Sequence, residues 1–390
     1  MSEEPPAPRL LWGRLVDGSG LDGEGFVRVA GGRIEAVERG EPTACARGDV
    51  EEVLGGPEST IAPGFCDLQV NGYGGIDCVD GPEAIAAIAA HLPAAGITGF
   101  CPTVITGPLD RLVAAPAQAA TAARASGPRA RILGIHQEGP FLSPDKKGAH
   151  DPAQLRAPDP ASIDRVIAAG PRILTIAPEL PGALEAIARL AEAGIVVSIG
   201  HSNASEEVAR AAIRAGARMA THLFNAMSAL AHRAPGVPGA VLTTPGVTAG
   251  LIADGQHVAP AVLAIAAGMK GAAGIALTSD AVAAAGAPPG RYRLGTQVVH
   301  SDGSRITLED GVTLAGSLAT TDVLVRVMAG IPGVGLRAAV EMATATPARL
   351  LGDAGHGLLR RGGAADLVVL DPGLRVVATV VGGAVAYRRD

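Results

Sequence analysis

The chain has 390 residues, of which 48% are hydrophobic and only 2% aromatic, and its formal net charge is −6. This length suits one large domain, or a large domain with a small companion. The negative charge and the lack of any Lys/Arg run argue against nucleic acid as a partner. Apolar stretches such as 262–267 are too short to cross a membrane, and the first ten residues resemble no signal peptide. We therefore expect a cytoplasmic protein that does not enter the membrane.

The two ends of the chain predict short strands. Residues 9 to about 61 contain alternating apolar runs separated by Gly-rich turns, and residues 365–387 contain three more strand-like runs. Neither layer is large enough to hold a core alone. We therefore expect one small β-sandwich built from both termini, with predicted domain bounds of 1–61 and 354–390 around an inserted segment, 62–353.

The inserted segment alternates strands and helices. Eight strands are predicted, at 65–70, 99–104, 131–136, 173–177, 195–199, 218–222, 247–253 and 275–279. Eight is the number that closes a (β/α)8 barrel. The alternative is an open doubly wound sheet, but no GxGxxG or GxxxxGK[ST] motif follows any of the strands. The pattern favours a TIM-like barrel.

Residues 195–227 are the most informative part of this barrel. His201 follows an apolar strand, residues 202–205 (SNAS) start a helix that Gly216 ends, and His222 follows the next strand. The active sites of such barrels lie at the carboxyl ends of the strands. One histidine there is often structural, but two in equivalent positions of consecutive units predict a pair of metal ligands.

Other strand ends also carry polar side chains. Ordinary turns would place Gly, Pro, Asn or Ser at these positions. Here they hold instead Gln69, Asn71, His136, Gln137, Glu138, Asn225, Asp254, His257 and Asp280. We expect these side chains to gather at one face of the barrel.

Glu138 with His201 and His222 gives one carboxylate and two imidazoles, a set that suits Zn²⁺ and leaves a position for water. A bound metal lowers the pKa of its water from about 15.7 toward about 7. Asp280, on the eighth strand, would take a proton from that water. Simpler interpretations are open for single residues, since Glu138 could pair with a nearby lysine and Asp280 could cap a helix.

Seven stretches of the chain are similar to the motifs of a known family. The chain resembles the amidohydrolase superfamily and, within it, the N-acetylglucosamine-6-phosphate deacetylases. The matching stretches span nearly the whole chain in the family's order: PGFCDLQVNGYGG (63–75), GIHQEGPFLSPDKKGAH (134–150), GHSNA (200–204), THLFNAM (221–227), ADGQHV (253–258), TSDA (278–281) and MATATPARLLG (342–352).

The resemblance implies roles for individual residues. Glu138, His201 and His222 would hold the metal, Asp280 would be the proton donor and acceptor, and His150 would stabilise the oxyanion. The positions that contact substrate in the family are Ala149, His150, Asn225, Ala226, Arg233, His257, Leu314, Ala315 and Gly316. A guanidinium suits a phosphate, and in relatives the equivalent of Arg233 reaches the site across a dimer interface, so a homodimer is expected.

The resemblance also bears on the metal and the reaction. Many amidohydrolases carry His-x-His after the first strand for a second metal, but this chain has Gln69-Val70-Asn71. Neutral amides are poor ligands, so we expect one divalent metal, preferably Zn²⁺, with Fe²⁺ or Co²⁺ as alternatives. The expected reaction is hydrolysis of N-acetyl-D-glucosamine 6-phosphate, a small amino-sugar phosphate, to D-glucosamine 6-phosphate and acetate. Open alternatives are the galactosamine epimer, another N-acyl substrate, and a non-catalytic assembly protein with the same fold.

Overall fold

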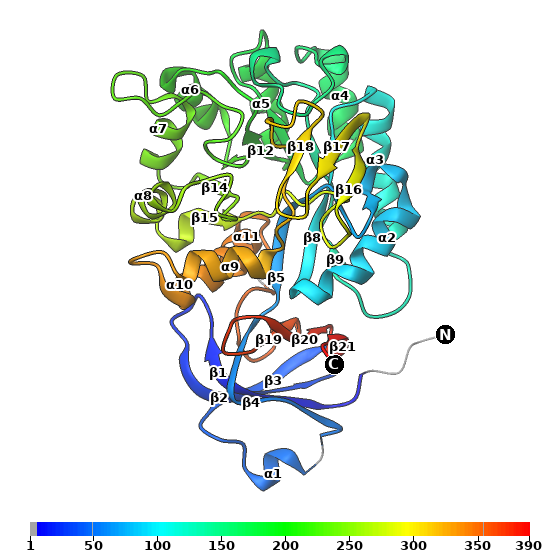
Figure 1. Cartoon of the computed structure of the whole chain (residues 1–390), viewed down its shortest axis with the longest axis vertical. Coiled ribbons are helices and arrows are strands. Elements are labelled where there is room, and N and C mark those ends of the chain that lie inside the picture. The colour runs from blue at the N-terminus through cyan, green and yellow to red at the C-terminus, as the bar shows by residue number, and fades with distance from the viewer. Residues whose placement is uncertain (1–5, 49, 354) are drawn as a thin grey trace.

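The computed structural model describes residues 6–48, 50–353 and 355–390. A large domain of strands and surrounding helices stands above a smaller sheet, in which the first and last parts of the chain lie together (Figure 1). None of the helices in the described ranges is long and apolar enough to cross a membrane. The predicted bounds at residues 61 and 353 stay a prediction, and residues 1–5, 49 and 354 of the predicted end segments lie outside the described part.

Eight parallel strands form a nearly closed barrel in the order β5-β8-β10-β11-β12-β13-β14-β15. Their bounds are Phe65–Val70 (β5), Ile97–Ile105 (β8), His136–Glu138 (β10), Ile173–Ile176 (β11), Val196–Ile199 (β12), Met219–Ala220 (β13), Thr248–Leu251 (β14) and Ile275–Leu277 (β15). The first and last strands meet through a parallel bridge between Val70 and Ala281. The buried carboxylate of Asp67 reinforces this seam by accepting from the backbone N–H of Ser279. The barrel prediction is thus confirmed against the doubly wound alternative.

The third strand differs from its prediction. Residues 131–136 were expected to be continuous, but β9 (Arg131–Ile132) pairs only with β8, and β10 begins at His136. Gly134 interrupts the extended backbone with a φ of 114°, and a Cβ there would lie 2.7 Å from the Arg172 side chain. As a result Glu138 is the last residue of its strand and does not lie in the loop beyond it.

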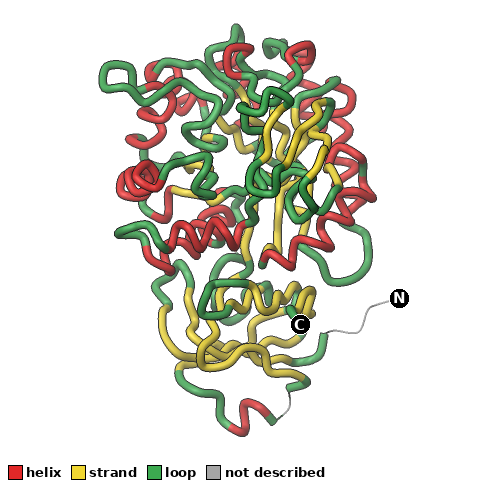
Figure 2. Tube along the Cα trace, viewed as in Figure 1, coloured by secondary structure: helices red, strands yellow, loops and turns green. Residues whose placement is uncertain are grey.

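Helices cover the outside of the barrel (Figure 2). They are α2 (Pro82–His91), α3 (Leu109–Ala122), α4 (Pro160–Ala169), α5 (Ala183–Glu192), α6 (Glu206–Ala215), α7 (Gly236–Thr243), α8 (Pro260–Lys270), α9 (Thr321–Ala329), α10 (Gly335–Ala343) and α11 (Ala345–Leu350). As expected, α6 begins after Ser205, whose hydroxyl accepts from the N–H of Val208, and ends at Gly216.

The strands of both termini join in one seven-stranded sheet, in the order β21-β20-β19-β4-β1-β2-β3. The bounds are Arg9–Val16 (β1), Asp22–Ala30 (β2), Arg33–Arg39 (β3), Glu52–Pro63 (β4), Leu367–Leu370 (β19), Val376–Val381 (β20) and Ala384–Arg388 (β21), with the short helix α1 at Ala44–Arg47. Pairing of β19 with β4 joins the two ends. Apolar side chains from both ends, including Leu11, Ile61 and Val369, form a cluster of their own. Both ends therefore build one small β domain, as predicted for the β-sandwich, and its seven strands belong to a single sheet.

Inside the barrel, an apolar floor supports a layer of hydroxyl groups. Leu68, Cys101, Ile173, Met219 and Ala276 come from five different strands and form the floor. Further along the barrel, Thr175 Oγ1 lies 2.7 Å from Thr221 Oγ1 and 2.7 Å from His136 Nε2. The bond between Thr175 and Thr221 spans β12, which lies between β11 and β13, so it fixes the strand ends from within the barrel.

Two small antiparallel units stand at the mouth of the barrel. They are the hairpin β6 (Gly72–Tyr73) and β7 (Ile76–Asp77), and the three-stranded sheet β16 (Gly290–Leu294), β17 (Gln297–Ser301) and β18 (Ile306–Leu308). Asp77 joins them, since its Oδ2 accepts from the N–H of Gly295 at 3.0 Å. These strands are additional to the eight that the sequence predicts for the barrel.

Candidate active site

A cavity of about 390 Å³ opens at the carboxyl ends of the barrel strands. Most of the predicted site residues line it: Glu138, Ala149, His150, His201, His222, Asn225, Ala226, His257, Asp280, Leu314 and Gly316. They come from seven separate stretches of the chain. Of the polar strand-end residues, Asn71, Glu138, His201, His222, Asn225, His257 and Asp280 line this cavity, whereas Gln69, His136, Gln137 and Asp254 do not.

The backbone is strained around this cavity. Six non-glycine residues in the described ranges have positive φ, and four of them line the cavity: His201 (47°), His222 (31°), Ala226 (47°) and Asp280 (51°). Left-handed backbone costs roughly 1–3 kcal/mol for a residue with a side chain and is concentrated at functional sites. The strained residues include the three that carry the two imidazoles and the carboxylate of Asp280 at the ends of their strands.

Three donor atoms converge at the floor of the cavity. Glu138 Oε1, His201 Nε2 and His222 Nε2 each lie 3.1 Å from the other two. Donor atoms that share one ion at about 2.0–2.2 Å are separated by roughly 3–3.5 Å. The three atoms are therefore spaced like three ligand atoms that share one metal ion.

The protonation of His201 explains why such a triangle needs a cation. Its Nδ1 lies 2.8 Å from the carbonyl oxygen of Lys146, which can only accept, so Nδ1 carries a proton. In the neutral ring Nε2 then presents a lone pair to the oxygen of Glu138. Burial by itself raises the pKa of Glu138, but the imidazoles of His201 and His222 outweigh it and hold this pKa well below its ordinary value. Facing lone pairs and an ionised carboxylate fit a divalent metal.

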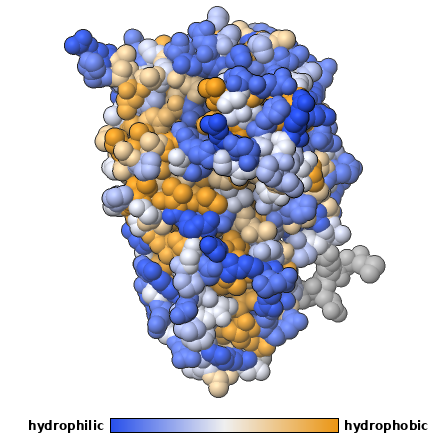
Figure 3. Space-filling view, in the orientation of Figure 1, coloured by the Kyte–Doolittle hydropathy of each residue, from blue (hydrophilic) through white to orange (hydrophobic). Residues whose placement is uncertain are grey.

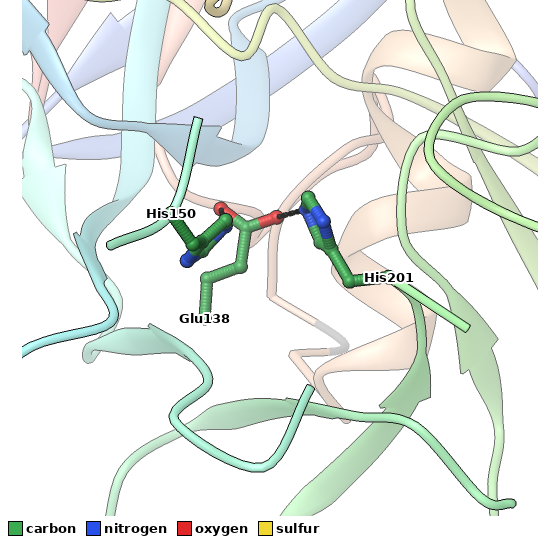
Figure 4. A group of neighbouring side chains, drawn as sticks. All are labelled: Glu138, His150 and His201. Carbon is green, nitrogen blue, oxygen red and sulfur yellow. Dashed lines mark hydrogen bonds and ion pairs between the residues drawn. The ribbon is translucent and has the colours of Figure 1, made fainter. Parts of the chain in front are cut away.

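His150 lies beside this triangle. Glu138, His150 and His201 form a buried group whose ligand atoms all lie within 4.8 Å of one another and could hold a metal ion (Figure 4). His150 Nε2 is 4.0 Å from Glu138 Oε2, farther than the 3.1 Å that separates His222 from Glu138. Burial, followed by the neighbouring His201, lowers the pKa of His150 to about 3, so this ring is neutral.

Asp280 faces the triangle from the eighth strand. Its Oδ1 accepts from Asn71 Nδ2 at 2.7 Å and from Gln69 Nε2 at 3.0 Å, and Gln69 also donates to Glu138 at 3.2 Å. Burial, with the charge of Glu138, raises the pKa of Asp280 to about 7. The two amides thus hold Asp280 in place, and Gln69 also holds Glu138.

At the opposite wall His257 is fixed by Asp254. His257 Nδ1 lies 2.7 Å from Asp254 Oδ2, and Asp254 Oδ1 accepts from the N–H of His257. Burial would raise the pKa of Asp254, but the bond with His257 outweighs it and lowers this pKa. The ring of His257 is therefore held by its Nδ1–H, and its other nitrogen is available to a ligand in the cavity.

Comparison with known proteins agrees with this geometry. Residues 60–386 match the model of the amidohydrolase family. The chain belongs to the amidohydrolase family. It is 40% identical over 347 residues to the human N-acetylglucosamine-6-phosphate deacetylase, covering 85% of this chain and 84% of the relative. It is 36% identical over 378 residues to the N-acetylgalactosamine-6-phosphate deacetylase of Escherichia coli O157:H7, covering 96% and 97%.

A solved amidohydrolase structure has the same fold over its whole length. It is the D267A variant of N-acetyl-D-glucosamine-6-phosphate deacetylase from Mycobacterium smegmatis in complex with N-acetyl-D-glucosamine 6-phosphate. That chain is 37% identical to this one and superposes with a TM-score of 0.91, covering 97% of this chain and 99% of its own. The predicted fold and family are confirmed.

Two predicted contact residues of this amidohydrolase do not line its cavity. Ala315 is fully buried and packs with Ile105 and Leu294 behind the wall. Arg233 is exposed in the loop before α7. His136, one of the polar strand-end residues, lies inside the barrel, where it bonds Leu68 O and Thr175. Its part is to support the strands.

Sequence reasoning missed several residues that position this site. Asp67 binds Ser279 next to Asp280, Lys146 binds His201 through its carbonyl, and Thr106 contacts His150 at 2.8 Å. For the first strand a signal was present, because polar residues at 67, 69 and 71 alternate with Leu68 and Val70. For Lys146 no side-chain pattern could help, since only its backbone takes part.

Proposed function

We propose that this amidohydrolase is a metal-dependent deacetylase that hydrolyses N-acetyl-D-glucosamine 6-phosphate to D-glucosamine 6-phosphate and acetate. The observation that carries the proposal is the meeting of three kinds of group in one cavity: a triangle of ligand atoms, a carboxyl group with a pKa of about 7, and a neutral imidazole. Amide hydrolysis needs all three. A water must lose a proton, a carbonyl oxygen must be stabilised, and a leaving amine must be protonated.

Glu138, His201 and His222 would hold one divalent metal through the three atoms that lie 3.1 Å apart. When bound, the ion supplies Lewis acidity, which polarises the amide carbonyl and acidifies water. One carboxylate and two imidazoles suit Zn²⁺. Gln69 and Asn71 direct their NH₂ groups at Asp280 and act as donors toward it. Their amide oxygens are neutral and therefore weaker ligands than the imidazoles that a second ion would need.

Asp280 would move the proton. Its Oδ1 is already engaged by two amide donors, so Oδ2 is the atom that accepts the proton of the attacking water. Asp280 then delivers this proton to the amine nitrogen as the C–N bond breaks, while the water oxygen becomes part of acetate. A pKa of about 7 serves both directions of transfer near neutral pH.

His150 would bind the carbonyl oxygen. The ring is buried and neutral, and its Nε2 lies on the cavity side, 4.0 Å from Glu138. A neutral imidazole with a hydrogen on Nε2 can donate to the oxygen as negative charge develops there. Ala149, Asn225, Ala226, His257, Leu314 and Gly316 would enclose the sugar.

We also propose a homodimer in which Arg233 of one subunit reaches the phosphate in the cavity of the other, in a protein of the cytoplasm. Arg233 does not line its own cavity. Beside its loop, Leu230 packs on α7, α7 contacts α8, and Leu230, Ile265 and Met269 are 50%, 54% and 54% exposed. Figure 3 shows apolar atoms over the side where Figure 1 places α7 and α8. Such a face suits contact with a second copy.

A second candidate is the galactosamine epimer. It is favoured by the Escherichia coli relative, whose match extends over 96% of this chain, whereas the human relative matches over 85%. Both reactions use the same amide and the same phosphate. They differ only in one hydroxyl of the sugar, which the cavity wall must discriminate.

Acetate release from a panel of N-acetylhexosamines, each with and without the 6-phosphate, tests these proposals. We expect N-acetylglucosamine 6-phosphate to have the highest kcat/KM and the unphosphorylated sugars to react poorly. A higher kcat/KM for the galactosamine ester would establish the second candidate. No acetate from any member, together with less than a tenth of an equivalent of metal, would favour a non-catalytic assembly protein.

A further inference from the structure

His150 could act in two ways that exclude each other. A hydrogen on Nε2 would make it a donor in the cavity, whereas a lone pair on Nε2 would make it a metal ligand beside Glu138 and His201. All three groups lie close enough for either role. Which role holds depends on the other ring nitrogen, Nδ1, and on the groups that bind it.

Thr106 binds this nitrogen in two ways. Its backbone N–H donates to His150 Nδ1 at 3.3 Å, so Nδ1 presents a lone pair. Its hydroxyl Oγ1 lies 2.8 Å from the same nitrogen. Because the backbone N–H already makes Nδ1 an acceptor, a hydrogen on Nδ1 itself is excluded. The hydroxyl directs its one hydrogen to this nitrogen at 2.8 Å in preference to the carbonyl oxygen of Glu138 at 3.3 Å. The single hydrogen of the neutral ring is then on Nε2.

The hydroxyl is confined to this position. Thr106 is 2% exposed, and it follows β8 directly. The carbonyl oxygen of Glu138, which can only accept, lies 3.3 Å from Oγ1 and is the second, more distant acceptor for the same hydroxyl hydrogen. A Cβ on Gly139 would come within 2.2 Å of Oγ1, so the loop beyond Glu138 leaves room for the hydroxyl only because residue 139 is glycine.

We propose that Thr106 is a positioning residue that holds His150 in the Nε2–H tautomer, which makes the ring a hydrogen-bond donor to the substrate carbonyl and keeps it out of the metal ligand set. This inference rests on the proposed deacetylase function for its kinetic consequence only. The tautomer itself is a property of the protein and is open to measurement without substrate.

The kinetic test uses Thr106→Val, which removes the hydroxyl and keeps the shape. We expect kcat to fall about ten- to hundredfold, less than the roughly 10²–10³-fold loss for deleting an oxyanion donor, with metal content unchanged. Thr106→Ser should recover most of the rate. Thr98→Val, a buried threonine at the other end of β8, is the matched control and should leave kcat unchanged.

A double-mutant cycle separates positioning from general support of the fold. In a His150→Ala background, Thr106→Val should change kcat by no more than about twofold, because its only route to the reaction is gone. An equal loss in both backgrounds would show that Thr106 merely supports the fold and would overturn the proposal. So would an unchanged kcat in Thr106→Val alone.

The tautomer is measured by long-range ¹H–¹⁵N NMR on histidine-labelled, zinc-loaded protein, with His150 assigned by its loss in His150→Ala. We expect a protonated Nε2 and an unprotonated Nδ1 in the natural chain. The opposite tautomer, or a metal-bound Nε2, would refute the proposal even if the enzyme is active. If no substrate of the panel reacts, the proposed function fails, and this spectrum still decides the tautomer.

Discussion

Histidines and carboxylates meet at both ends of the barrel, but with opposite outcomes. At the end that faces the terminal sheet, Arg131 binds Asp366 at 2.8 Å, while His356 binds Asp353 at 2.7 Å and Asp366 at 3.3 Å. In this lower cluster, formed by Arg131, Asp353, His356 and Asp366, each cation has an anion beside it. In the upper cluster, at the carboxyl ends of the strands, Glu138 Oε1 and the Nε2 atoms of His201 and His222 face one another, and no arginine or lysine side chain of the described residues bonds to them.

The two clusters differ in whether their own groups satisfy one another. The lower cluster satisfies itself, and burial of its groups is offset by mutual bonds: the pKa of His356 is raised and those of Asp353 and Asp366 are lowered, in each case by their shared hydrogen bonds against the effect of burial. In the upper cluster the pKa of Glu138 is lowered and that of His222 is raised in the same way, but one carboxylate serves two imidazoles, His222 Nδ1 is buried without a partner among the described residues, and strained backbone maintains the arrangement. Only the upper cluster needs something from outside the chain.

The largest expected effect comes from breaking the upper cluster. His222→Asn removes one corner of the triangle and should lose most of the bound metal and nearly all acetate release. Metal content by elemental analysis and kcat by acetate assay check it. His136→Asn, an imidazole inside the barrel that does not belong to the triangle, is a control for metal content and should keep the metal. A His222→Asn protein with full metal would remove this residue from the ligand set.

Asp280→Asn should separate metal binding from proton transfer. Its two amide neighbours remain, and the carboxyl that accepts the proton is lost, so kcat should fall about 10²–10⁴-fold while metal content stays the same. Steady-state kinetics and elemental analysis of the same preparation measure both. Retention of a tenth or more of the natural kcat would mean that another group carries the proton.

Arg233→Ala tests whether a cation from a second subunit reaches the cavity of the upper cluster. A charged hydrogen bond is worth about 1.5–3 kcal/mol, and more if bidentate, so kcat/KM for the phosphorylated sugar should fall roughly ten- to several-hundred-fold. The unphosphorylated sugar should be nearly unaffected, and Arg233→Lys should restore only part. Equal losses on both sugars would make the residue structural.

A smaller effect is expected on the stability of the folded protein, which should depend on pH through the lower cluster. Because the folded-state pKa of His356 is raised, its stabilising contribution is full below about pH 6.5 and disappears as pH rises through that pKa. The pKa values of its carboxylate partners are lowered, so their contribution is present above about pH 4 and lost as pH falls further.

His356→Gln should therefore lower the melting temperature at pH 5.5 by roughly 1–2 °C, for a loss of about 1 kcal/mol in a chain of this length, and change it less at pH 8.5. Thermal denaturation followed by circular dichroism measures this. His300→Gln, for which no ion pair exists among the described residues, is the control. A larger effect at pH 8.5 than at pH 5.5 would contradict the assigned sign.

Much of the fold follows from patterns along the chain. Apolar runs with turn residues between them place the eight strands, and the residue after each run places His201, His222 and Asp280 at one face. The third strand was misplaced because nothing in an apolar run reveals that Gly134 takes a positive φ and breaks it. Local sequence shows where strands lie, and tertiary packing decides where they are interrupted.

The contacts that hold the site, in contrast, could not be predicted from the sequence. Gln69 binds Glu138 and Asp280 across 69 and 211 residues of chain, and Thr106 meets His150 across 44. These bonds depend on the register of separate strands and loops, which no pattern in one sequence gives. The resemblance to the family predicts that Ala315 contacts the substrate, but the structure shows its side chain packed in the apolar cluster behind the cavity.

The metal content of the purified protein tests the central claim most directly. The triangle of Glu138, His201 and His222, with Gln69 and Asn71 engaged by Asp280, predicts one equivalent of divalent metal per chain that survives dialysis and is required for acetate release. Elemental analysis before and after chelation, with activity measured alongside, gives the answer. Two equivalents, both retained and both required for turnover, or full activity with less than a tenth of an equivalent, would contradict the account.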